Sequence, residues 1–298
     1  MRGRFESVPL WRRRHIVVAS GLGPSTSYEV LDPALIFDTA TSIPSDELRM
    51  AGHSKWKQIK HYKAATDAKR GALFTKLIRE ITMAAKMGGG DPAGNARLRV
   101  AIEAARAKSM PKDNIDRAIK KGTGELEGVD YQEVTYEGYA PGGVALIIDA
   151  VTDNPTRTVA DVRHKMSRGG GNLGTPNSVS FLFEKKGVLS IPVEKHADED
   201  AMLEAALEAG AEDFRRDDEE TYIVTTDPAS FHAVKQALED KGIVSSEAEL
   251  QMVPKTTVTV SGPDVESLLK LIESLEDLDD VQKVWANFDI DDADLAAL

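Results

Sequence analysis

Cations alternate with aromatic side chains along residues 53–63. Trp56 lies between two lysines, and Tyr62 lies between a histidine and a lysine. A cation can neutralise a phosphate and release condensed counterions, and an aromatic ring can stack on an unpaired base. The pattern therefore predicts that this segment binds nucleic acid. The alternative is that Trp56 and Ile59 pack beneath neighbouring helices while the lysines face water.

The predicted contacts continue into the helices that follow. The full set of candidate nucleic-acid contacts is His53, Lys55, Trp56, Lys57, Lys60, His61, Lys63, Lys69, Arg70, Lys76, Arg79, Lys86, Arg99 and Arg106. Lys120 and Lys121 stay outside this set, because cations at the end of a helix are explained by its dipole.

The charge of the chain is segregated along its length. Residues 51–128 hold 17 Lys/Arg and 8 Asp/Glu, whereas residues 129–298 hold 14 and 35, within a chain of net charge −12. Such blocks of like charge can simply be protein surface that faces solvent. So sharp a change of sign nevertheless favours a polyanion-binding module attached to an acidic body.

The residues that would support other chemistry do not form a pattern. There are no cysteines, the six histidines are scattered, and neither a zinc-protease helix motif nor a serine-hydrolase turn occurs. Residues 169–174 are rich in glycine, but they follow a predicted helix and precede a strand, unlike a nucleotide-binding loop. A helix stop explains them better, although a functional loop stays open. We expect no enzymatic activity, no cofactor, no metal and no small-molecule substrate.

Hydrophobic periodicity predicts three helices between residues 71 and 122. In the first, the apolar residues fall on one side and Lys76, Arg79 and Lys86 on the other, so we expect cations on a solvent-facing side. Glycines 88–90 should end this helix, and Asp91 should cap the second with Pro92 as its first residue. The third should begin near Pro111.

Beyond residue 128 the period becomes that of strands and helices. Strands are predicted at 134–139, 144–151, 179–183 and 188–191, with a hairpin loop at 185–187. A helix should begin near Thr156. Further strands and helices to residue 288 predict the fold class: α+β, with an N-terminal helical domain followed by two ferredoxin-like α+β domains, one inserted in the other.

The expected domains follow from these elements. Residues 50–128 form the basic helical domain, 129–193 with 256–298 the first α+β domain, and 194–255 the inserted one. Residues 1–49 are Arg-rich at first and then lack a sustained period. An organellar transit peptide is one interpretation. We favour a translation start assigned too early, with Met50 as the natural first residue and 1–49 a poorly ordered extension.

Several motifs, in order, resemble the YebC-type family. They are A-G-H-S-K-W at 51–56, D-A-K-R-G at 67–71, F-T-K-L-I-R-E at 74–80, G-G-G-D-P at 88–92, N-I-D-R-A-I at 114–119, Y-E-G-Y-A-P-G-G-V-A at 136–145, D-N-P-T-R-T at 153–158, G-G-N-L-G at 170–174 and S-V-S-F-L-F at 178–183. The resemblance spans Met50 to about Phe288. Two positions depart from it: Asn177 stands where glycine is more usual, and Pro155 where a polar residue is common.

The resemblance implies a three-domain cytoplasmic or mitochondrial protein that regulates gene expression. For this chain we expect a cytoplasmic regulator that binds DNA and acts in transcription. The alternative is a translation factor that binds ribosomal or transfer RNA on the ribosome and helps difficult, proline-containing stretches. No apolar run approaches the ~20 residues of a membrane helix, so no membrane partner is expected.

Overall fold

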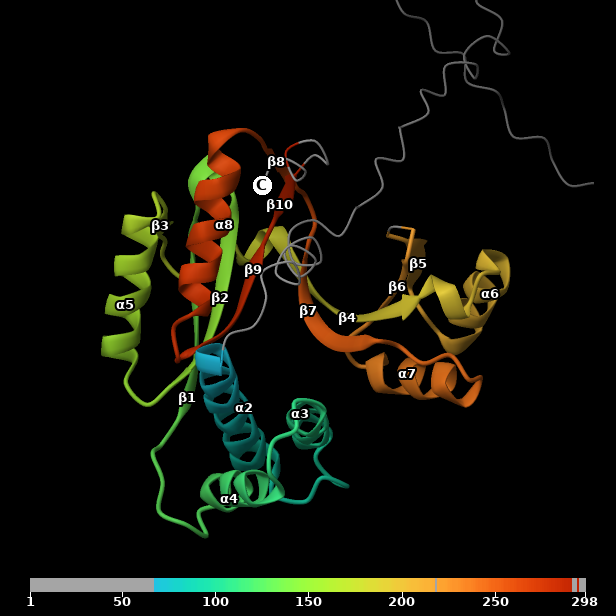
Figure 1. The fold of residues 1–298 in the computed structure, drawn as a ribbon, viewed down its shortest axis with the longest axis horizontal. Coiled ribbons are helices and arrows are strands. Elements are labelled where there is room, and N and C mark those ends of the chain that lie inside the picture. The colour runs from blue at the N-terminus through green and yellow to red at the C-terminus, as the bar shows by residue number, and fades with distance from the viewer. Residues whose placement is uncertain (1–66, 218, 291–293, 295–298) are drawn as a thin grey trace, which may run out of the picture. The chain divides into compact units, whose positions relative to one another are not determined.

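A computed structural model describes residues 67–217, 219–290 and 294, with side chains from residue 71. The elements form one helical group and two groups built on sheets (Figure 1). The described elements follow one another along the chain from α2 to β10. No described helix is long and apolar enough to cross a membrane.

The helical group contains the three helices that the sequence predicts. They are α2 (Asp67–Gly88), α3 (Ala96–Ala107) and α4 (Lys112–Gly122). Their apolar faces share one core, which includes Ile81, Leu98, Ile102 and Ile115. Burial of these faces against one another stabilises α3 and α4, which have 12 and 11 residues and are short for isolated helices.

The predicted cap of α3 is wrong. The helix begins at Ala96, and the N-cap is Asn95, whose carboxamide oxygen accepts from the backbone N–H of Leu98 at 3.0 Å. Its amide nitrogen donates to the carbonyl oxygens of Ala84 at 2.7 Å and Gly89 at 2.9 Å. Asp91 instead accepts from the N–H of Ala93 in a local turn. The buried Asn95 therefore joins the end of α2 to the start of α3.

The first sheet group combines elements from two separate parts of the chain. Its elements are β1 (Gln132–Tyr139), β2 (Ala145–Thr152), α5 (Pro155–Arg168), β3 (Asn172–Leu173), β8 (Val258–Val260), α8 (Pro263–Glu276), β9 (Val281–Ala286) and β10 (Phe288–Ile290). The four-stranded sheet is antiparallel with order β3-β1-β2-β9, and β8 pairs with β10 in parallel.

Helices α5 and α8 lie side by side on one face of this sheet (Figure 1). Leu146 and Ile148 of β2 face these helices, whereas Ala145 and Ile147 pack on the other face with Trp285. Because β2 is buried on both faces, its sequence is almost continuously apolar. Pro155 occupies the first turn of α5 behind the cap Asn154, a position where proline is favourable.

The second sheet group is continuous in sequence. It consists of β4 (Phe183–Pro192), α6 (Glu199–Ala209), β5 (Asp213–Arg216), β6 (Thr221–Thr226), α7 (Phe231–Asp240) and β7 (Glu247–Pro254). The sheet order is β5-β6-β4-β7, with every neighbouring pair antiparallel. The fold is thus α+β, as the sequence predicts. Strand β4 pairs within this sheet, although the predicted boundary at residue 194 assigns it to the first α+β domain.

The strand predicted at residues 179–183 is wrong except at Phe183, the first residue of β4. Residues Ser180–Leu182 form a short 3-10 helix, because the carboxylate of Glu137 accepts the backbone N–H groups of Asn177, Val179 and Ser180 at 2.7–2.9 Å. These N–H groups therefore need no partner strand.

The predicted hairpin loop at 185–187 lies inside β4. A Cβ at Gly187 would lie 2.4 Å from the ring of Phe231, so this glycine permits close packing of α7 and does not make a turn.

Candidate nucleic-acid interface

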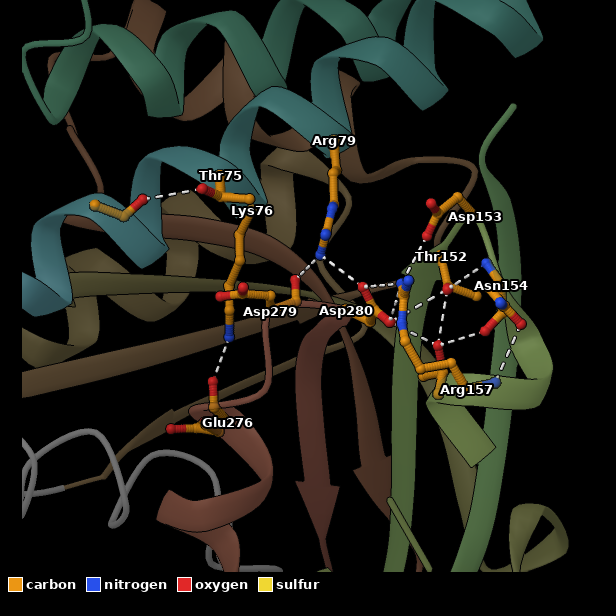
Figure 2. A network of polar contacts seen from close by, with 12 residues as sticks. Thr75, Lys76, Arg79, Thr152, Asp153, Asn154, Arg157, Glu276, Asp279 and Asp280 are labelled. Carbon is orange, nitrogen blue, oxygen red and sulfur yellow. Dashed lines mark hydrogen bonds and ion pairs between the residues drawn. The ribbon is translucent and has the colours of Figure 1, made fainter. Parts of the chain in front are cut away.

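The cationic side of α2 contacts the first sheet group (Figure 2). Arg79 forms an ion pair with Asp280 at 3.0 Å, and its side chain is only 12% exposed. The same guanidinium donates to the carbonyl oxygen of Asp279 and lies 5.7 Å from the ring centre of Tyr131. Arg79 therefore works as a bridge inside the chain.

The carboxylate of Asp280 collects four partners at this junction. It accepts from Thr158 at 2.6 Å, Thr152 at 3.2 Å and Arg157 at 3.1 Å, in addition to Arg79. Burial would raise the pKa of Asp280, but the hydrogen bonds from Thr158 and Arg157 and the charges of Arg79 and Arg157 outweigh it, so the pKa is lowered.

Two further predicted cations of α2, Lys76 and Lys86, also have partners in the chain. The ammonium of Lys76 donates to the carbonyl oxygen of Glu276, and that of Lys86 pairs with Asp130 and donates to the carbonyl of Tyr131 at 2.8 Å. The expectation that this side of α2 presents its cations to solvent is wrong for Lys76 and Arg79, which are both partly buried. The helical periodicity correctly placed Lys76, Arg79 and Lys86 on one face of α2. It could not show which part of the chain packs against that face.

Arg97 is a further internal cation that the sequence did not single out. Its guanidinium pairs with Glu80 of α2 at 2.8 Å and with Glu133 of β1. Burial would lower the pKa of Arg97, but the hydrogen bonds to Glu80 and Glu133 outweigh it and raise the pKa. Arg97 is thus committed to joining α2, α3 and β1.

The remaining cations of the helical group whose side chains the structure describes lie on the exposed surfaces of α3 and α4 and at the turn between them. We call this set the α3–α4 cationic surface: Arg99, Arg106, Lys108, Lys112, Arg117, Lys120 and Lys121. Arg99 donates to the carbonyl oxygen of Pro92 at 2.9 Å. Among the described residues, the other six have no carboxylate partner. They are therefore the cations of this group that stay available to an external anion.

Arg106, Lys108 and Lys112 surround the turn between α3 and α4, which has a defined geometry. The N–H of Met110 donates to the carbonyl of Ala105 at 3.0 Å, and that of Ser109 to Arg106 at 2.8 Å. Ser109 has φ +60°, the left-handed conformation that usually requires glycine at this helix end. These hydrogen bonds fix the conformation of the turn. The backbone positions of Arg106, Lys108 and Lys112 are therefore fixed as well.

Carboxylates interrupt this surface at three places. Glu103 of α3 lies 3.8 Å from Lys235 of α7. Asp113 and Asp116 are exposed in the first half of α4, while Arg117, Lys120 and Lys121 occupy its second half. This distribution also suits the dipole of α4. The exposed cations of this surface are therefore concentrated at the α3–α4 turn and at the end of α4.

The sequence identified only part of this surface. The sequence predicts Arg99 and Arg106 but not Lys108, Lys112, Arg117, Lys120 and Lys121, because no periodic pattern distinguishes an unpaired cation from a paired one. Seven predicted contacts lie outside the described residues: His53, Lys55, Trp56, Lys57, Lys60, His61 and Lys63. Lys69 and Arg70 lie in α2, but their side chains are outside the described set. Within the described part of the chain, no three His, Asp or Glu residues are grouped to hold a metal ion.

Comparison with known proteins gives consistent matches along the chain. Residues 54–125 match the model of the TACO1/YebC protein N-terminal domain, and residues 131–288 match the TACO1/YebC second and third domain. A Gemmatimonas aurantiaca protein named "probable transcriptional regulatory protein" is 66% identical over 247 residues, covering 83% of this chain and 99% of the relative.

Two further proteins extend the comparison. An Acidithiobacillus ferrooxidans protein with the same name is 57% identical, covering 84% of this chain and 98% of the relative. A crystal structure of a conserved hypothetical protein from Aquifex aeolicus is similar with TM-score 0.69 and 49% identity, covering 76% of this chain and 93% of that one.

Proposed function

The chain belongs to the TACO1/YebC family, and on that premise we propose that it is a non-enzymatic, nucleic-acid-binding regulator of gene expression. The observation that carries the proposal is the α3–α4 cationic surface, where six cations have no carboxylate partner among the described residues. Unpaired surface cations release counterions from a nucleic acid when they bind its phosphates, whereas internally paired cations have already lost that capacity.

The predicted contacts of residues 53–63 and 69–70 belong to the same proposal. They precede α2 directly in sequence and would extend the binding region with rings able to stack on bases. Lys76, Arg79 and Lys86 contribute indirectly, because they attach the helical group to the acidic body. We also propose that the chain contains two ferredoxin-like α+β units, one inserted in the other, and that it is located in the cytoplasm.

Transcription is the first candidate process, and it rests on the printed names of the bacterial relatives. A regulator of transcription would contact duplex DNA. In that case the α3–α4 cationic surface would bind the phosphates of the duplex, and sequence would be read by other side chains in a groove.

Translation is the second candidate, and the chemistry of α4 favours it. A helix that reads the major groove presents arginine, asparagine or glutamine to the bases from its N-terminal part. The exposed face of α4 presents Asp113 and Asp116 there, and these carboxylates repel phosphate. Cations at a turn and a helix end suit the irregular backbone of folded RNA better.

Sedimentation of cell lysate separates these candidates. The lysate is run through a sucrose gradient untreated, after ribonuclease and after deoxyribonuclease, and the protein is followed by immunoblot. Co-migration with ribosomal particles that ribonuclease abolishes supports the translation candidate. Co-migration with DNA that deoxyribonuclease abolishes supports transcription. Sedimentation as free protein under all three conditions, at low salt, contradicts a nucleic-acid-binding function.

A further inference from the structure

A groove lies between the C-terminal half of α5 and the face of α8 that carries Asp264 to Ser274. It is an open groove with a volume of about 660 Å³, which is within the size range of ligand sites. Its walls include His164, Lys165 and Arg168 from α5 and Lys270 from α8, against the single carboxylate of Asp264. The groove is therefore cationic.

This concentration of cations is an exception within an acidic region. Residues 129–298 hold 14 Lys/Arg and 35 Asp/Glu, yet α5 alone holds four of these cations and one acidic residue. Arg157 is committed to Asp280 and Asp153. Lys165 and Arg168 have no ion-pair partner among the described residues, and Lys270 pairs only with Glu266 at an exposed site. Exposed pairs of this kind contribute little and exchange readily.

The loop formed by Gly169, Gly170 and Gly171 borders the groove. Gly169 and Gly170 line it, and Gly170 has φ +76°. A Cβ at Gly169 would lie 2.7 Å from Leu271 of α8, and a Cβ at Gly171 would lie 2.8 Å from the carbonyl oxygen of Tyr139. Side chains here would push the loop away from α8 and β1. The glycines therefore keep this loop packed against α8 and β1, and Gly169 and Gly170 contribute a wall without side chains beside the cations.

We propose that the α5–α8 groove binds backbone phosphates of the same nucleic acid that the α3–α4 cationic surface binds. The inference rests on the proposed function and adds a second contact in the acidic body. Charged and polar walls suit an oxyanion rather than an apolar ligand. Arg168 supplies a guanidinium, which holds phosphate in a bidentate fashion, and Lys165 supplies a point charge. A phosphate contact in this groove holds the acidic body to the nucleic acid, although the net negative charge of that body repels it.

The test compares Arg168→Glu with Arg163→Glu. Both change one exposed arginine of α5, but Arg163 does not line the groove. Binding of fluorescein-labelled ribosomal RNA fragments and duplex DNA is measured by anisotropy over a range of salt. We expect Arg168→Glu to weaken binding of the preferred nucleic acid roughly tenfold and to reduce the salt slope by about one, with Arg163→Glu close to wild type. Arg168→Lys should retain most of the affinity.

Two further measurements make the outcome specific. Thermal melting of each variant checks α5, because cations in its last turn also stabilise the helix. Ultraviolet cross-linking followed by mass spectrometry should place nucleotide adducts on residues 164–170. Equal affinities for Arg168→Glu and Arg163→Glu overturn the inference. So does adenosine monophosphate binding to the groove with RNA affinity unchanged, since the groove would then serve a small anion.

Failure of the inference is distinguishable from failure of the proposed function. If the wild-type chain binds neither RNA nor DNA, both fail together. If wild type binds, and charge reversal at Arg106 weakens binding while Arg168→Glu does not, only the groove assignment fails.

Discussion

The carboxylate of Asp280 joins three elements of the chain. It receives Arg79 from α2, Thr158 from α5 and Thr152 from β2, and it lies at the start of β9 (Figure 2). A single side chain thus couples the helical group to the first sheet group. Because Arg79 and Asp280 are both largely buried, their interaction is screened less by solvent than a surface pair.

Replacing Asp280 by Asn keeps the size of the side chain but removes its charge. The guanidinium of Arg79 then loses its counterion at a site where it is 12% exposed. Removing one partner of a largely buried ion pair costs roughly 3 kcal/mol. We expect urea denaturation to show a loss of that order in the free energy of unfolding. Asp279→Asn is the matched control, because only its backbone carbonyl contacts Arg79; an equal loss in both variants would refute this role of Asp280.

The same carboxylate should make stability depend on acid pH. The pKa of Asp280 is lowered in the folded chain, so its contribution is present above the unfolded value of about 4 and is lost as pH falls towards the folded value. The difference in unfolding free energy between wild type and Asp280→Asn should therefore shrink below about pH 4. Protonation of Glu137 does not contribute to this difference in unfolding free energy, because both proteins retain Glu137. A difference that stays constant through the acid range would contradict the lowered pKa.

At the scale of elements, the turn between α3 and α4 depends on one strained residue. Ser109 has φ +60°, which is unfavourable for any residue with a Cβ. Ser109→Gly should relieve this strain and raise the free energy of unfolding by about 1 kcal/mol, after the entropy of glycine is included. Chemical denaturation measures the change, with Ser109→Ala expected to stay near wild type. A destabilised Ser109→Gly would show that the serine side chain stabilises the turn.

The extent to which elements were predictable follows from the range of their interactions. Helices α2 and α4 and strands β1 and β2 follow from local periodicity, and the glycines after α2 and α5 end both helices as expected. The sequence predicts a strand at residues 179–183 because Glu137, whose carboxylate accepts from the backbone N–H groups of Val179 and Ser180, is distant in sequence. Gly187 resembles a turn glycine until Phe231 packs against it. Local patterns cannot contain such tertiary partners.

At the scale of the whole molecule, charge segregation identifies the basic part of the chain but not its binding surface. Lys76 and Arg79 belong to the helical group, yet their partners come from the acidic body. The acidic body therefore neutralises part of the basic region, while six cations of the α3–α4 cationic surface have no carboxylate partner among the described residues. Which cations remain available depends on three-dimensional packing, so the sequence could predict the region and only two members of the surface, Arg99 and Arg106.

The most direct test of this account measures nucleic-acid affinity after charge reversal at the α3–α4 turn. One variant carries Arg106→Glu, Lys108→Glu and Lys112→Glu. The matched control carries Lys185→Glu, Lys195→Glu and Lys255→Glu, three exposed lysines of the acidic region with no ion-pair partner among the described residues. Both variants change net charge equally, so a difference between them reports position.

Association constants for labelled ribosomal RNA fragments and duplex DNA are determined over a range of salt. We predict that the turn variant loses most of the wild-type affinity and that its salt slope falls by as much as about three, while the control keeps the greater part of both. Equal losses in the two variants, or unchanged binding by the turn variant, would contradict the claim that the α3–α4 cationic surface binds the nucleic acid.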